Sequence, residues 1–218
     1  MNGPIGAVAL VGIGYLIGAL PVGVLIGRLV GGVDIRQAGS GRTGATNAMR
    51  SLGTRWAAVV FVLDLAKGAV AVLLAMALYQ AGPAGSPPLV HAAAGLAAVV
   101  GHNWSIFIRF SGGRGVATSA GALLVLAPLT MVVLVPVAAA IVLLTRYVSL
   151  ASMSAAVVAV PLTVVMLSLG LAGAAPVMFG VGAATLIVFA HRDNIVRLRC
   201  GTERRWGENE RAGSRGRT

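Results

Sequence analysis

The sequence predicts an all-α, polytopic integral membrane protein with about seven transmembrane helices. Of its 218 residues, 57% are hydrophobic and only 11% are charged, whereas about a quarter of the residues of a typical soluble domain are charged. A bilayer core about 30 Å thick takes about 20 apolar residues per helical crossing. The chain therefore has room for roughly six to eight short crossings and for no separate soluble domain.

Polar or Gly- and Pro-rich stretches divide the apolar sequence and give the order of the crossings. Arg28 closes the first apolar run, and a polar stretch at 34–55 separates it from the second. An uncharged stretch at 80–88 separates the second run from the third. In order, the apolar runs are residues 5–29, 56–79, 89–100, 115–145 and 148–190.

The last two runs are too long for one crossing each, and both are expected to fold back as hairpins. As one straight helix, residues 115–145 would be about 46 Å long at ~1.5 Å per residue. A turn at Ala127-Pro128 returns Arg114 and Arg146 to the same side, since proline does not continue a helix comfortably. A turn at 170–176 divides the next run in the same way. The total is seven crossings, of which 116–127 is short enough to be re-entrant or tilted.

The basic residues set the expected orientation. Seventeen residues are lysine or arginine, and because Lys67 is the single lysine, sixteen are arginine. Seven crossings place all sixteen arginines on one side, which the positive-inside rule assigns to the cytoplasm, with the N-terminus outside and the C-terminus inside. Residues 1–202 are expected to form one transmembrane domain and 203–218 a basic, disordered tail. The net charge of +11 thus favours membrane lipids as partners and not nucleic acid.

Polar residues gather in four stretches on that expected inner side, at 39–50, 101–118, 145–152 and 191–203. Two of them are Gly-rich loops that run into apparent helix starts, where free N–H groups and the helix dipole favour anions. Glycine lets the backbone approach a phosphate closely, and Arg50 and Arg114 supply guanidinium forks for bidentate contact. Two such loops on one face indicate two phosphate-bearing ligands. The same stretches contain Ser40, Asn47, Ser149, His191 and Asn194.

Each of these residues also has a plainer interpretation. Glycines often serve close helix packing, and loop arginines often serve topology alone, so the joint clustering carries the argument. Asp64 and Lys67 lie on one helical face in the second run, where charges are costly and usually paired or functional. A buried structural pair is the first interpretation, and Lys67 reaching a phosphate by snorkelling is the second.

Two other classes of protein compete with an enzyme at this point. Intramembrane charges and Gly-interrupted spans suit a transporter or channel for a small anion, although the polar residues crowd one face and not the bilayer midplane. A non-catalytic membrane scaffold explains the arginines but not the two glycine loops. The single Cys200 and three scattered histidines predict no metal site. No cofactor is expected, because the GxGxxG match at 39–44 follows no strand.

Six sequence blocks carry a resemblance to a known family. In order they are GSGRTGATNAMR at 39–50, DLAKG at 64–68, GH at 101–102, GGRGVAT at 112–118, RYVSLAS at 146–152 and HRDNIVRLRCGTE at 191–203. With these blocks the chain resembles the bacterial acyl-phosphate:glycerol-3-phosphate acyltransferases (the PlsY type). It departs from the family at Arg42, where asparagine is usual, at Ser105, where a proline is usual, and at Arg114, where lysine is usual.

The resemblance implies an enzyme of phospholipid biosynthesis in the bacterial cytoplasmic membrane, with seven helices and its active site at the cytoplasmic face. Such an enzyme moves a fatty acyl group from acyl phosphate to the 1-hydroxyl of glycerol-3-phosphate, giving lysophosphatidic acid and inorganic phosphate. The HxxxxD signature of thioester-using acyltransferases is absent, which favours the acyl-phosphate donor. A soluble enzyme that produces acyl phosphate is a candidate partner.

The resemblance also assigns residues to two substrates. The acyl phosphate is expected at the loop formed by Gly112, Gly113, Arg114 and Gly115, and Asn47 and Lys67 complete the substrate-binding set. Acyl phosphate is a mixed anhydride with a good leaving group, so positioning and charge stabilisation can carry much of the barrier. His191 is the best general base, with a substrate phosphate as the alternative, and Ser149 and Asn194 would orient the attacking hydroxyl. The glycerol-3-phosphate site would be lined by Ser40, Arg50, Arg114, Ser149, His191 and Asn194.

Overall fold

The computed structural model describes residues 3–79 and 88–207, and within these ranges it is helical and contains no strand. The helices follow the order expected from the apolar runs. They are α1 (Pro4–Ala19), α2 (Val22–Gly31), η1 (Ile35–Gln37), α3 (Ala45–Leu52), α4 (Thr54–Leu78), α5 (Pro88–Asn103), η2 (Ile106–Ile108), α6 (Val116–Leu126), α7 (Pro128–Thr145), α8 (Val148–Ser168), α9 (Ala174–Ala190) and α10 (Arg192–Arg199).

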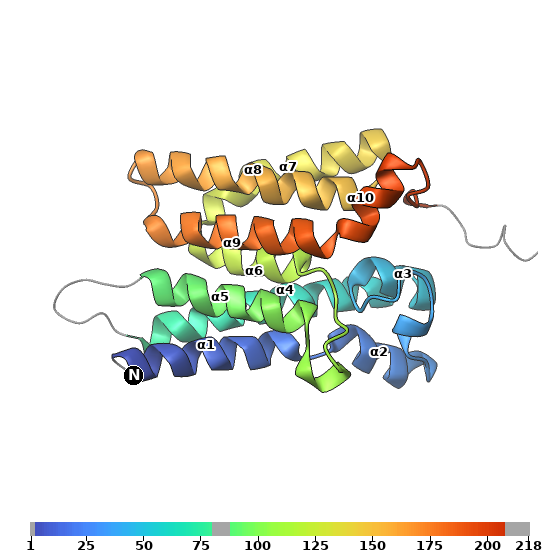
Figure 1. The fold of residues 1–218 in the computed structure, drawn as a ribbon, viewed down its shortest axis with the longest axis horizontal. Helices are drawn as coiled ribbons and strands as arrows, with labels where there is room; N and C mark the ends of the chain where they lie inside the picture. Colours follow the sequence, from blue (N-terminus) through green and yellow to red (C-terminus); the bar gives the residue numbers. More distant parts are fainter. Residues whose placement is uncertain (1–2, 80–87, 208–218) are drawn as a thin grey trace, which may run out of the picture.

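The long helices lie alongside one another, and the short ones gather at one end. Figure 1 shows α1 and α4 to α9 along the length of the molecule, with α2, α3 and α10 at the right-hand end. The interior is filled mainly by small side chains such as Ala92, Ala122 and Ala183, around the fully buried ring of Phe179 on α9. The predicted all-α class is therefore confirmed.

Fewer helices than expected are long and apolar enough to cross a membrane unaided. Among the described residues four meet this test: residues 4–31, in which α1 and α2 count together, α4, α7 and α8. Counting α9 and α10 as one span bent by 59° gives five. Helix α5 has 16 residues and α6 only 11. The expected turns are present, because α6 ends at Leu126 before Pro128, and α8 and α9 are separated by 169–173.

The first apolar run is two helices and not one, which the sequence analysis did not predict. Pro21 has no N–H to continue the helix, and the preceding Leu20 adopts φ −54° and ψ 116°, as a residue before proline prefers. The break exposes backbone carbonyls that need partners. The Ser105 hydroxyl donates to the Ala19 carbonyl, and the Lys67 ammonium donates to the Leu20 carbonyl at 3.2 Å. Two distant side chains thus cap the broken helix.

Glycines let neighbouring helices touch backbone to backbone. A Cβ atom at Gly68 on α4 would lie 1.9 Å from the Thr118 carbonyl oxygen on α6, and a Cβ at Gly121 on α6 would lie 1.9 Å from the Leu65 carbonyl oxygen on α4. Real Cβ atoms do not approach so closely, so only glycine fits at both positions. This close approach places the start of α6, and the loop before it, against α4.

We expect Gly121→Ala to destabilise the protein, because α4 and α6 must separate to admit the methyl group. Overpacking of this kind costs about 1–3 kcal/mol, so the melting temperature in detergent should fall by at least about 2 °C. Gly12→Ala is the matched control, because a Cβ at this helical glycine meets no atom within 4 Å. Equal melting temperatures for the two variants would contradict the packing described here.

Candidate active site

The polar loops meet at the end of the bundle where α2, α3 and α10 lie (Figure 1). Four segments contribute: the loop between α2 and α3, the loop between α5 and α6, the turn between α7 and α8, and the chain from the end of α9 onward. Every predicted site residue except Lys67 comes from these segments or from the helices directly beside them. The clustering expected from the sequence therefore appears in space.

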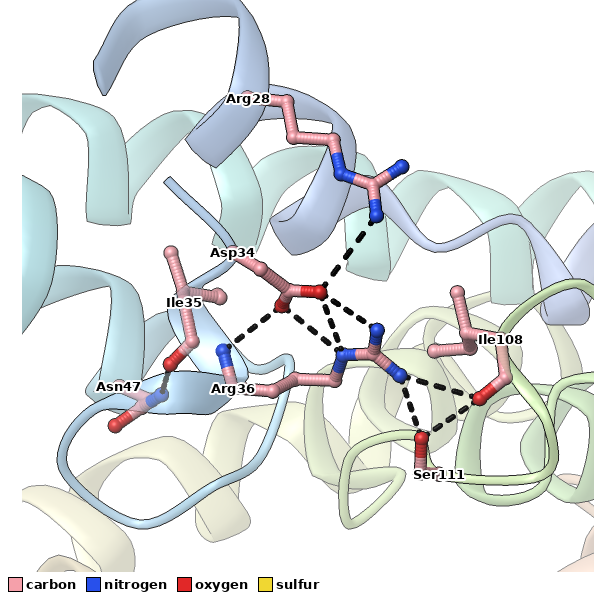
Figure 2. A network of polar contacts seen from close by, with 7 residues as sticks. All are labelled: Arg28, Asp34, Ile35, Arg36, Asn47, Ile108 and Ser111. Atoms are coloured by element: carbon pink, nitrogen blue, oxygen red, sulfur yellow. Dashed lines mark hydrogen bonds and ion pairs between the residues drawn. The ribbon is translucent and has the colours of Figure 1, made fainter. Parts of the chain in front are cut away.

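Asn47, which was predicted to bind substrate, holds the first loop together. It is 2% exposed. Its Nδ2 donates to the carbonyls of Ile35 at 2.6 Å and Arg42 at 2.8 Å, and its Oδ1 accepts from the Ser40 N–H at 2.9 Å. Figure 2 shows the bond to Ile35. Gly39, at φ 61°, leaves no room for a side chain above this amide. Every polar atom of the Asn47 side chain has a protein partner, so the amide shapes the loop, and its substrate contact stays a prediction.

The second loop is tied to the end of α5. The N–H of Gly112 donates to the Asn103 carbonyl at 3.1 Å, and the N–H of Gly113 donates to the His102 carbonyl at 3.0 Å. These two amides are therefore engaged by the protein itself, and substrate binding by the loop stays a prediction. Gly115 adopts φ 76°, and α6 starts after it without a side-chain cap. The start of α6 remains as the part of this loop that can receive an anion.

Arg114 stands among other charged groups. Burial lowers its pKa to about 10, and repulsion by Arg42 and Arg197 adds to this shift, while Glu203 and Asp193 oppose it. Its Nε is buried and has no hydrogen-bond partner in the described structure. Two guanidinium groups from two other segments thus act on Arg114 at this end of the molecule.

His191 lies beside this group as a neutral base. It is 3% exposed, and its Nδ1 donates to the Ile187 carbonyl, 2.8 Å away. Burial lowers the pKa of His191 to about 4, the bond to Ile187 opposes that shift, and the charge of Arg114 adds to it. At neutral pH the imidazole is therefore uncharged. Because Nδ1 carries the proton, Nε2 holds the free electron pair.

Glu203 joins the last two polar segments, and the sequence analysis assigned it to the tail. Its Oε1 accepts from the Ser149 hydroxyl at 2.7 Å and from the Asn194 Nδ2 at 2.6 Å, and its Oε2 pairs with Arg197 at 2.8 Å. Burial alone would raise the pKa of Glu203, but these hydrogen bonds outweigh burial and leave it lowered. A carboxylate at the end of an arginine-rich block was the signal that could have identified it.

The chain after Glu203 folds back over the turn between α7 and α8. The Trp206 N–H donates to the Arg146 carbonyl at 2.7 Å, and the Arg146 Nη2 donates back to the Trp206 carbonyl at 2.8 Å. The Arg205 guanidinium lies over the Tyr147 ring, 5.6 Å from its centre. The contacts between the C-terminal chain and the helices therefore continue past 202/203, where the sequence analysis expected the domain to end and the tail to begin. Residues 208–218 of the expected tail lie outside the described residues.

Lys67 lies inside the bundle and not in the loops. Its ammonium is 2.9 Å from the Asp64 carboxylate, and the His102 Nδ1 is 3.4 Å from the same oxygen. All three side chains are nearly fully buried. With its further bond to the Leu20 carbonyl, the ammonium is engaged in structural contacts. The geometry favours the buried structural pair over substrate binding by Lys67.

The remaining predicted residues belong to the first loop and its helix. Ser40 is half-buried, and its backbone is fixed by Asn47. Arg50, in the last turn of α3, packs beside Gly39, where a Cβ would lie 3.7 Å from the Arg50 Cδ. Arg42 connects this loop to α10, because its Nη2 lies 3.6 Å from the Asp193 carboxylate. The first loop and the His191–Glu203 segment thus face each other.

Fold and site together define a class of protein: an apolar helical bundle that carries a cationic, glycine-shaped site at one end. Residues 8–201 match the family model described as glycerol-3-phosphate acyltransferase. The chain belongs to the glycerol-3-phosphate acyltransferase family, and it is an enzyme of the integral membrane type. The alternative interpretations as a transporter, a channel or a scaffold are therefore set aside.

Named relatives and solved structures agree with this assignment. The chain is 48% identical over 199 residues to glycerol-3-phosphate acyltransferase 2 of Moorella thermoacetica, covering 90% of this chain and 95% of that one. It is 46% identical over 200 residues to a glycerol-3-phosphate acyltransferase of Thermus thermophilus, covering 91% and 94%.

The structural comparison covers nearly the whole chain. The crystal structure of PlsY (YgiH), an integral membrane glycerol 3-phosphate acyltransferase, in its glycerol 3-phosphate form superposes with a TM-score of 0.80 at 36% identity, covering 95% of this chain and 99% of that one. The lysophosphatidic acid form of PlsY gives a TM-score of 0.78 at 36% identity, covering 92% and 95%.

We expect Glu203→Gln to lower both thermal stability and turnover, because a neutral amide cannot satisfy two donors and the Arg197 charge at once. Breaking such a partly buried network should cost about 1–3 kcal/mol, measured as the shift in melting temperature in detergent. Asp193→Asn is the control, because it removes one carboxylate charge at a half-exposed position of the same end. A Glu203→Gln protein as stable as Asp193→Asn would contradict a structural role for the carboxylate.

Proposed function

We propose that this enzyme transfers a fatty acyl group from acyl phosphate to the 1-hydroxyl of glycerol-3-phosphate, releasing lysophosphatidic acid and inorganic phosphate. The single observation that carries this proposal is Arg114, whose buried Nε has no hydrogen-bond partner among the described residues and whose charge is repelled by Arg42 and Arg197, beside the buried, neutral His191. Arg197 and Arg42 already pair with protein carboxylates, whereas the unpartnered Nε of Arg114 suits a phosphate oxygen. Both substrates of this reaction carry a phosphate.

The two phosphates would be held by charge and by helix geometry. A phosphate between Arg114 and Arg42 offsets their repulsion, and a guanidinium fork suits phosphate oxygens. The uncapped start of α6 adds the partial positive charge of a helix N-terminus. Arg50, which lies beside Gly39, would bind the phosphate of glycerol-3-phosphate at the first loop. The glycerol 3-phosphate and lysophosphatidic acid forms of the similar PlsY structures support the acceptor and the product.

His191 would act as the general base. Its Nε2 takes the proton from the 1-hydroxyl of glycerol-3-phosphate while that oxygen forms a bond to the carbonyl carbon of the acyl phosphate. The bond from that carbon to the phosphate oxygen then breaks, and the phosphate leaves with the electron pair. The proton passes from His191 to the departing phosphate. Arg114 stabilises the charge on the carbonyl oxygen and on the leaving group.

Ser149 and Asn194 would orient the attacking hydroxyl through their shared partner. Both donate to Glu203, which fixes their side chains. The Asn194 Oδ1 is buried and has no hydrogen-bond partner among the described residues, so it can accept from a glycerol hydroxyl. Glu203 would then act on the reaction indirectly, by holding these two groups in place.

We also propose seven membrane crossings, made by α1, α4, α5, α6, α7, α8 and α9. The polar loops at one end support a cytoplasmic site in the bacterial cytoplasmic membrane, with the N-terminus outside, because arginine-rich loops are retained inside. The short α6 fits this assignment as a helix packed against α4 and shielded from lipid on that side. A soluble enzyme that produces acyl phosphate would deliver its product to this end.

A direct assay tests the reaction and the assigned residues. Purified protein given palmitoyl phosphate and labelled glycerol-3-phosphate should form lysophosphatidate and phosphate, whereas palmitoyl-CoA should not replace the donor. His191→Ala and Arg50→Ala should each lose about 10²-fold or more in kcat/KM while they keep the wild-type fold. Arg55→Ala, which removes an exposed arginine that lies over Trp56, should stay active. Absence of product with the wild-type protein would reject the proposal.

The orientation can be tested with the native cysteine. Cys200 is exposed at the end of α10, so a membrane-impermeant maleimide should label it in inverted vesicles but not in intact spheroplasts. A Leu171→Cys variant in a Cys200→Ser background should show the reverse pattern, because this exposed position lies in the turn between α8 and α9. Labelling of both positions from the same side would refute the assigned topology.

A further inference from the structure

One arginine outside the proposed machinery connects the two substrate loops. Arg36 lies in η1, in the first loop, and its Nη1 donates to the Ile108 carbonyl at 3.1 Å and to the Ser111 hydroxyl at 2.6 Å. Ser111 also donates to the Ile108 carbonyl at 2.7 Å. Figure 2 shows the guanidinium reaching across to this turn of the second loop. The contact joins segments that are far apart in the sequence.

Asp34 fixes the direction of that guanidinium. Its carboxylate accepts from the Arg36 Nε at 3.0 Å and from the Arg36 Nη2 at 2.6 Å, and it also accepts from the Arg36 backbone N–H at 3.0 Å. These hydrogen bonds lower the pKa of Asp34, so the pair stays ionised. Arg28 approaches the same carboxylate only to 3.7 Å from a largely exposed position. The paired, planar geometry leaves Nη1 of Arg36 pointing at the second loop.

The turn that Arg36 contacts is conformationally costly. Arg109 and Phe110 adopt φ 55° and 58°, and they are two of the three non-glycine residues with positive φ in the described chain. A side chain in this left-handed region clashes with its own backbone, so such residues persist only where other contacts hold them. The two Arg36 acceptors, Ile108 and Ser111, stand immediately before and after this pair.

We propose that Arg36 is a positioning residue that clamps the Arg109–Phe110 turn and thereby sets the position of the loop from Gly112 to Arg114. On the far side of the turn, Gly112 and Gly113 are bonded to the end of α5. The loop is thus held from two directions, by α5 and by the first loop. Arg36 makes the acceptor loop and the donor loop one rigid unit, which keeps Arg114 at a fixed distance from the first loop.

The first test compares Arg36→Gln with Arg28→Gln. This test rests on the proposed function, because it measures turnover of acyl phosphate. Arg36→Gln should lower kcat/KM by about 10–100-fold, the loss expected when catalytic groups shift by about 1 Å. Arg28→Gln removes a charge beside the same Asp34 without touching the second loop, and should stay within about twofold of wild type. Equal losses in the two variants would overturn the clamp.

The second test asks whether relief of backbone strain replaces the clamp. Glycine adopts positive φ without steric cost, so Phe110→Gly should make the turn less dependent on Arg36. The kcat/KM loss caused by Arg36→Gln should then shrink to a few-fold when measured in the Phe110→Gly background. A loss of equal size in both backgrounds would show that Arg36 acts elsewhere, for example on the first loop alone, and would overturn the proposal.

A third measurement is independent of activity. Amide hydrogen exchange of residues 105–115 should speed up in Arg36→Gln and stay at the wild-type rate in Arg28→Gln. Unchanged exchange in Arg36→Gln would also overturn the proposal. If wild-type protein did not use acyl phosphate, the proposed reaction would fail while this exchange result still decided the fate of the clamp.

Discussion

The structure depends on an imbalance of charge at one end of an apolar bundle. The chain has 17 basic residues and only 6 acidic ones, and the described contacts use the few carboxylates several times over. Glu203 accepts hydrogen bonds from Ser149 and Asn194 and pairs with Arg197. Asp34 pairs with both Arg36 and Arg28. The remaining positive charge acts as repulsion on the partly buried Arg114, and in the reaction that we propose the phosphates of the substrates would offset it.

Such a site needs a rigid support, which the helices supply through backbone contacts. The second loop is bonded to the last carbonyls of α5, and α6 is pressed against α4 where glycines face carbonyl oxygens. The broken end of α1 is capped by Ser105 and Lys67. The carbonyls freed at the break in the first apolar run thus become anchors between helices.

Much of the scaffold could be predicted from local sequence, because its signals are local. The turn at Ala127, the glycine loops before α3 and α6, and the gathering of polar segments at one end follow from proline, glycine and charge positions. The number of membrane crossings was harder to predict from the sequence. Helices α5 and α6 are too short to be recognised as crossings by length, and packing against other helices holds them in place. The break at Pro21 was missed because the flanking residues are as apolar as the helices they separate.

The gathering of the polar segments could be predicted from the sequence, but the contacts of each side chain could not. Asn47 and Lys67 have the polarity expected of ligand-binding groups, yet their partners are carbonyls and a carboxylate of the protein itself. Glu203 and Arg36 were overlooked because each acts through groups that are distant in sequence or belong to other segments. Sequence motifs identify which side chains gather, whereas the three-dimensional contacts show which of them hold the loops.

The most direct test of the central claim is the thermal stability of purified protein with and without glycerol-3-phosphate. Wild-type protein should melt at a higher temperature as glycerol-3-phosphate is added, because the ligand binds only the folded site, and glycerol alone should have no effect. Arg114→Gln should melt higher than wild type without ligand, since it removes a partly buried charge and its repulsion by Arg42 and Arg197, and it should gain less from the ligand. If Arg114→Gln melts no higher than wild type without ligand and keeps the full ligand-induced rise in melting temperature, the claim that uncompensated positive charge at Arg114 binds the phosphate is contradicted.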